Sequence, residues 1–179
     1  LWRDTGALTT LVPALGAVDD VTLATIDELP RASAGGRNSP QRTSNRLAAL
    51  FLDVPSRSVR PVLTSLRFSK HETSWVGTLV ERWATLGSEL ARVLAERDPS
   101  DEEMRRWLSR IGRLYAGAFL RVAQARWRAM RDAGVAAPSD AAVRSLHRRM
   151  RRSLYRDPIE VADLQVSGDD LRRSGIPAG

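Results

Sequence analysis

Apolar residues recur every three or four positions along residues 104–130, and this spacing constrains the fold more than any other feature of the chain. It is the spacing of one buried helix face, because an α-helix completes a turn in about 3.6 residues. Ser100 precedes Glu103 by three residues, the arrangement of a capping box at a helix start. Gly134 closes the stretch, so the sequence predicts one long helix here, or two helices broken near Gly117.

The remaining chain shows the same helical spacing, and apolar and polar residues almost never alternate along it in the way that predicts β-strands. Ser69 stands three residues before Glu72, so a second capping box begins a helix, which Gly87 and Ser88 are expected to interrupt. Further helices are predicted within residues 1–15, 19–30 and 42–54, before Leu66, and within residues 137–158 and 167–175. Residues 31–41 are polar and glycine-rich, which is typical of a mobile loop. The expected fold class is all-α, with the helices around one continuous core.

The chain is basic: it carries 28 lysines and arginines against 21 acidic residues, a formal net charge of +7. All of these basic residues except Lys70 are arginines. Such a charge favours a polyanionic partner, because phosphate neutralisation supplies most of the sequence-independent affinity for nucleic acids. The alternative at this point is a basic surface that is merely solvated.

The helix predicted within residues 137–158 concentrates this charge. Its narrow apolar stripe consists of Val143, Leu146, Met150 and Leu154. Most of its remaining circumference carries Arg144, Arg148, Arg149, Arg151, Arg152 and Arg156. A helix with one thin apolar seam lies on the surface, and the guanidinium fork suits phosphate. Two interpretations stay open: a helix that contacts a nucleic-acid backbone, or a helix whose arginines pair with neighbouring acids. Tyr155 and His147 lie among these arginines, where each would stack on a base or ribose, or instead pack in the core.

Several kinds of catalytic site are excluded by what the sequence lacks. It has no cysteine, only two histidines, no glycine-rich phosphate loop and no Asp-x-Asp pair for metal-assisted phosphoryl transfer. The adjacent acids at 19–20 and 169–170 stand at predicted helix starts, where capping explains them. We therefore predict no catalytic and no metal-binding residues. No apolar run is long enough for a membrane span and no secretion signal is present, so a cytoplasmic chain without a membrane partner is expected.

Four segments together resemble a known family: "LWRDTGALTTLVPAL", "RLAALFLDV", "LRFSKHE" and "IEVADLQVSGDDLRRSGIPAG". Their order is similar to that of the segments after the catalytic head in bacterial CCA-adding tRNA nucleotidyltransferases and their poly(A) polymerase relatives. The likeness spans nearly the whole chain. In that family the head carries the metal-binding carboxylates, and helical neck, body and tail regions hold the tRNA.

The resemblance implies a tRNA-binding helical portion of such an enzyme, lacking the catalytic head. Residues 1–66 would form a neck-like region, 67–134 a body, and 135–179 the basic helix and the start of a tail. The partners implied are tRNA or another structured RNA and a separate head, to which ATP or CTP and Mg²⁺ would belong, so that no cofactor is expected in this chain. The expected RNA-binding residues are Arg67, Lys70, Arg144, Arg148, Arg149, Arg151, Arg152, Arg156, Arg172 and Arg173. Because the family continues into another helix after the Gly-x-Pro-x-Gly turn, the chain is expected to be a fragment.

Two alternatives remain. A helical protein-interaction scaffold would leave an apolar patch exposed, with Trp107 or Trp127 as part of it. A degenerate His-Asp domain is the other, because some relatives carry such a metal site near a segment like "RLAALFLDV". Here Leu52 and Asp53 occupy that place, so phosphohydrolase activity is not expected. The sequence does not separate CCA addition from poly(A) synthesis.

Overall fold

A computed structural model describes residues 6, 10–16, 18–31, 39–159, 163 and 173, and within them it contains helices and no strand. Its elements are η1 (Pro13–Leu15), α2 (Asp20–Glu28), α3 (Ser39–Leu50), α4 (Ser56–Ser65), α5 (Lys70–Glu96), α6 (Asp101–Ile111), α7 (Arg113–Asp132) and α8 (Asp140–Arg156). The all-α fold class is thereby confirmed. No helix among the described residues is both long and apolar enough to cross a bilayer.

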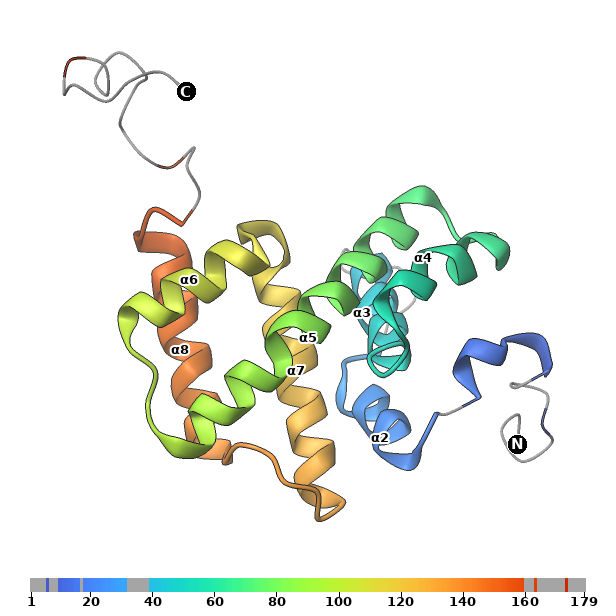
Figure 1. The fold of residues 1–179 in the computed structure, drawn as a ribbon, viewed down its shortest axis with the longest axis horizontal. Helices are drawn as coiled ribbons and strands as arrows, with labels where there is room; N and C mark the ends of the chain where they lie inside the picture. Colours follow the sequence, from blue (N-terminus) through green and yellow to red (C-terminus); the bar gives the residue numbers. More distant parts are fainter. Residues whose placement is uncertain are drawn as a thin grey trace.

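The long helix α5 organises the fold, and the other helices gather at its two ends (Figure 1). Helices α3 and α4 pack on its N-terminal part, whereas α6 and α8 pack on its C-terminal part. Helix α7 crosses α5 and contacts α2, α3, α6 and α8, so it connects the two groups. One apolar cluster runs through both groups, from Leu15 to Ile159, with Phe51, Trp107 and Phe119 among its buried side chains. Helices α3 to α8 all contribute to this cluster, whereas the end of α2 packs on a second, smaller cluster of Leu29, Ala49, Leu52, Val122 and Ala125.

The predicted helix starts are confirmed where a polar side chain caps the first turn. Ser69 and Ser100 each form the full reciprocal capping box of α5 and α6, with Glu72 and Glu103. Ser139 Oγ accepts a hydrogen bond from the backbone of the third residue of α8, at 3.2 Å. These contacts satisfy backbone N–H groups that have no partner inside the helix.

Three predicted boundaries are wrong, and each error concerns a local signal with more than one meaning. Helix α5 runs without interruption through Gly87, where a Cβ would lie 2.9 Å from the Trp83 indole. This glycine makes room for a ring rather than ending a helix. The break after α6 lies at Gly112, with φ 81° and ψ 141°, instead of near Gly117. Helix α3 begins at Ser39, inside the predicted loop. Residues 32–38 of that loop, and the segments 1–5 and 164–172 of the predicted terminal helices, lie outside the described residues.

Candidate nucleic-acid interface

Helix α8 has one buried and one exposed face. Its apolar stripe is buried against the core, as predicted: Val143, Leu146, Met150 and Leu154. The opposite face consists of side chains three or four residues apart, which lie above one another on a helix. These side chains are Arg144, Arg148, Arg151, Arg152 and Tyr155, and all five are exposed. We call this surface the basic face of α8.

Two of the predicted arginines of α8 make ion pairs within the protein. Arg149 lies at the edge of the basic face and donates to Asp101, the first residue of α6, over 2.7 Å. This charge lowers the pKa of the Asp101 carboxyl. Arg144 lies 3.5 Å from Asp140, one turn earlier on α8, in an exposed pair. Such an exposed pair contributes little and leaves the guanidinium accessible. Arg149 therefore joins α8 to α6, while Arg144 stays available to a partner.

The remaining predicted arginines of α8 have no such partners. Arg148, Arg151, Arg152 and Arg156 are exposed, and none makes a hydrogen bond or ion pair with a described residue. Tyr155 is the most exposed large apolar side chain in the described part of the chain, at 76%. An aromatic ring in this position, flanked by free guanidinium groups, is suited to stack on an unpaired base.

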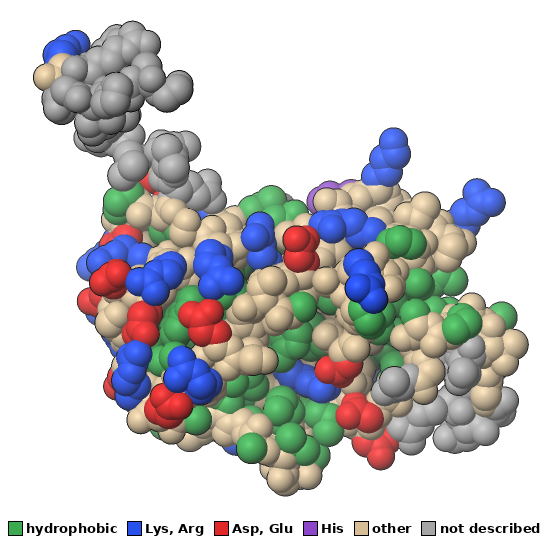
Figure 2. Space-filling view, viewed as in Figure 1, with side chains coloured by type: hydrophobic (Ala, Val, Ile, Leu, Met, Phe, Trp, Pro, Cys, Tyr) green, Lys and Arg blue, Asp and Glu red, His purple; other side chains and the backbone are tan. Residues whose placement is uncertain are grey.

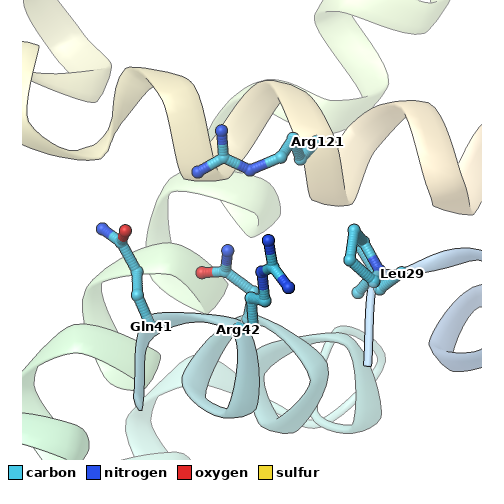
Figure 3. Close-up of a pocket in the computed structure, with 6 residues that line it drawn as sticks. Leu29, Gln41, Arg42 and Arg121 are labelled. Atoms are coloured by element: carbon cyan, nitrogen blue, oxygen red, sulfur yellow. The ribbon is translucent and has the colours of Figure 1, made fainter. Parts of the chain in front are cut away.

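The positive charge continues from α8 onto α7 and α3. Burial lowers the pKa of His147, and the charges of Arg151 and Arg121 lower it further. Arg121 lies on α7, and across a surface pocket it faces Arg42 of α3 (Figure 3). Arg121 and Arg42 are not among the residues expected to bind RNA, because the arginines of α7 and α3 are spread along helices of mixed composition. No local pattern brings them together.

The other predicted binding residues lie elsewhere. Arg67 has φ 64° and ends α4, where the Phe68 N–H donates to the Leu63 carbonyl over 3.1 Å. This geometry is a helix C-terminal motif that usually holds glycine. Lys70 begins α5 and lines a cavity of about 280 Å³ together with Arg60. Figure 1 places this junction at the end of α5 remote from α8, so the structure does not join the two sets. Arg173 is exposed, and Arg172 lies outside the described residues.

Asp19 and Asp53 are both exposed, and the buried side chains of Thr22 and Arg126 join them in one hydrogen-bonded network. The Arg126 side chain is 11% exposed and lies 2.9 Å from the Asp53 carboxylate. Thr22 Oγ1 accepts from Arg126 over 3.1 Å and lies 2.7 Å from Asp19 Oδ1. Burial raises the pKa of Asp19, but hydrogen bonds from Thr22 and the charge of Arg126 outweigh it, so the pKa falls. Asp19 also caps α2, as predicted.

Metal ligands are not grouped in the described part of the chain: no cluster of three or more histidine and acidic residues occurs there.

On the face shown in Figure 2, basic and acidic side chains alternate over α6 and the C-terminal half of α5. Arg92, Arg106 and Arg110 each pair there with a glutamate, at 3.1, 2.8 and 3.2 Å. This surface is charged but locally neutral, unlike the basic face of α8.

Comparisons with protein-family models, with curated proteins and with solved structures found no match to this chain.

Proposed function

We propose that this chain binds structured RNA through the basic face of α8, as the tRNA-holding helical portion of a tRNA nucleotidyltransferase of the CCA-adding or poly(A) polymerase type. The observation that carries the proposal is the set of exposed arginines on α8 without acidic partners. The order of the four family-like sequence segments supports the same class. The nucleotidyl transfer itself belongs to a separate catalytic head, with its ATP or CTP and Mg²⁺, so this chain alone binds tRNA without extending it.

The geometry of α8 suits a phosphate backbone. From Arg144 to Arg152 the helix rises about 12 Å, at roughly 1.5 Å per residue. The guanidinium groups on this stretch project from one exposed face, and each is able to donate two parallel hydrogen bonds to a phosphate. Tyr155 extends the row by about one turn. A partner with a charged backbone and unpaired bases therefore fits this surface better than an apolar one.

The scaffold alternative loses the surface on which it depended. Trp107 and Trp127 are 1% and 2% exposed, so neither contributes to an apolar patch. The exposed large apolar side chains that remain come from different elements, and single exposed residues of this kind are normal on soluble proteins. The His-Asp alternative has no support at Asp53, which pairs with Arg126 beside a cavity of about 110 Å³ whose described lining contains no histidine.

The test is a fluorescence-anisotropy titration with folded tRNA and with an unstructured RNA of equal length, over a salt series. Three arginines of the basic face are changed together: Arg148→Gln, Arg151→Gln and Arg152→Gln. If each contacts one phosphate, the slope of log affinity against log salt falls by roughly 2 to 3, at about 0.7–0.9 per contact. The wild-type chain should also bind tRNA more tightly than the unstructured RNA.

A matched control removes the same net charge from the locally neutral surface: Arg92→Gln, Arg106→Gln and Arg110→Gln. This control should leave the salt slope nearly unchanged. If both triple variants weaken binding equally, only overall basicity is at work and the proposed interface is wrong. If wild type binds both RNAs equally, the tRNA-holding role is wrong even where the interface is right. Tyr155→Ala should weaken binding to an RNA with unpaired bases by about 1–3 kcal/mol.

A further inference from the structure

A second cationic feature includes Arg121 of α7, the helix that packs against α8. It is a pocket of about 250 Å³ between the end of α2, the first turns of α3 and the middle of α7. Its apolar wall is formed by Leu29 and Pro30, and Arg42 and Arg121 enter it from opposite sides (Figure 3). No described residue that lines it is acidic.

The two arginines differ from their neighbours because no described residue neutralises them. Arg46, one turn after Arg42 on α3, donates to the carbonyl oxygens at positions 26 and 29 over 2.5 and 2.9 Å. Arg128, two turns after Arg121 on α7, pairs with Glu28 over 3.3 Å. In contrast, neither Arg42 nor Arg121 makes a hydrogen bond or ion pair with a described residue. Burial, and then the charge of Arg42, lower the pKa of Arg121. Two facing cations without an anion repel each other.

The polar groups beside the two arginines also favour a bound anion. Asn45 is buried, and its Oδ1 accepts a hydrogen bond from the Trp75 indole over 3.2 Å. This bond directs the amide oxygen towards the indole, and the amide N–H groups remain as donors alongside the second lone pair of that oxygen. Gln41 adds a second amide at the pocket edge. Four donor side chains and no acid therefore surround the cavity, and guanidinium pairs are well suited to phosphate.

We propose that this pocket binds a phosphate group between Arg42 and Arg121. The phosphate belongs either to an RNA strand or to a free anion. That it belongs to RNA rests on the proposed function: α7, which carries Arg121, packs against α8, so a strand on the basic face of α8 would reach the pocket across α7. The pocket itself stands on its own geometry.

The first experiment measures the thermal unfolding of the full chain with and without inorganic phosphate, at constant ionic strength. An anion that binds the folded state alone raises the Tm. Wild type should show a saturable rise with phosphate, which Arg42→Gln and Arg121→Gln should abolish. Because each variant removes one of two repelling cations, its Tm without phosphate should equal or exceed that of wild type. Arg128→Gln, a change of equal charge on the same helix, should keep the phosphate response.

The second experiment repeats the RNA salt series with the same variants. If the phosphate is part of the RNA, Arg42→Gln and Arg121→Gln should each weaken tRNA binding several-fold and lower the slope by about 0.7–0.9. A phosphate response without any change in RNA binding supports the pocket with a free anion and overturns the RNA connection. The absence of both responses overturns the pocket. In a further outcome, wild type responds to phosphate but the α8 triple variant binds RNA as well as wild type does. This result would support the pocket and contradict only the proposed function.

Discussion

The ion pair between the buried Arg126 and the half-exposed Asp53 offers a quantitative test of how the N-terminal helices are attached to α7. Arg126 Nη2 lies 3.1 and 2.9 Å from the two Asp53 oxygens, and its Nη1 donates to Thr22 over 3.1 Å. The arginine side chain is 11% exposed and the aspartate side chain 49% exposed. Removing one partner therefore has a different free-energy cost for each, because water is able to solvate an unpaired Asp53 but not an unpaired Arg126.

Asp53→Ala should destabilise the fold by about 2–3 kcal/mol. Removing one partner of a fully buried pair costs roughly 3–5 kcal/mol, and the value is smaller here because the solvent already reaches the pair on the Asp53 side. Thr22 and the nearby Asp19 also continue to compensate part of the arginine charge. Arg126→Met should cost less, about 1–2 kcal/mol, since it leaves a carboxylate that water is able to solvate. In the double variant no unpaired buried charge remains, so its cost should fall below the sum of the two single costs by about 1–2 kcal/mol.

The assay is urea unfolding of the wild type, the two single variants and the double variant at pH 7, followed by circular dichroism. If the same variants are unfolded by heat instead of urea, a destabilisation of about 2–3 kcal/mol corresponds to a decrease in Tm of roughly 4–12 °C for a chain of this size. Costs that add within about 0.5 kcal/mol would refute the coupling. The coupling would also be refuted if Asp53→Ala destabilised the fold less than Arg126→Met does. That result would mean that the buried guanidinium of Arg126 is stable without the Asp53 carboxylate.

Three further predictions concern stability and are checked by thermal unfolding. Gly112→Ala should lower the free energy of unfolding by about 1–3 kcal/mol, since its positive φ with extended ψ is open almost only to glycine. The matched change Gly117→Ala should be neutral or stabilising by up to about 1 kcal/mol, because its Cβ would meet nothing nearer than 3.7 Å. Ser100→Ala should cost about 1 kcal/mol by removing the α6 cap. Burial and the charge of Arg151 lower the pKa of His147 from its ordinary 6.5, so its stabilising contribution is complete above pH 6.5 and is lost as the pH falls through the folded-state pKa. Wild type should therefore lose more Tm than His147→Gln between pH 7.5 and pH 5, and an equal loss would contradict this.

The sequence predicts helix starts well in this protein because a cap is a contact within one turn. The serines at positions 69, 100 and 139 all cap the helices assigned to them. Helix breaks are harder to predict, because glycine has two opposite uses. Gly112 ends a helix through its backbone freedom, whereas Gly87 lies inside one to admit the Trp83 ring. Trp83 lies one turn before Gly87, and its ring packs against Phe119 and Trp127 of α7, so only the packing that fixes this ring distinguishes the two uses.

Part of the candidate site could likewise be predicted from residues close together in the sequence, whereas the rest depends on contacts between distant segments. The spacing on α8 predicts which arginines share the exposed face, since that depends on helix geometry alone. It does not predict that Arg149 pairs with Asp101, because this contact requires α6 to lie beside α8. The pocket between Arg42 and Arg121 is hidden in the sequence for the same reason.

The net charge of the chain says less about function than the way the fold distributes it. Many arginines serve the structure itself: Arg46 binds backbone carbonyls, Arg126 the carboxylate of Asp53, and Arg113 the carboxylate of Asp163 over 2.7 Å. These charges contribute to the total of +7 but are not available to a polyanion. The described arginines without a hydrogen bond or ion pair to another described residue include Arg148, Arg151, Arg152 and Arg156 on α8 and the facing pair Arg42 and Arg121. A chain of the same composition with acidic residues gathered around each of these arginines would have the same isoelectric point but a locally neutral surface in place of the basic face of α8. The proposed function therefore depends on the positions of the charges rather than on their total.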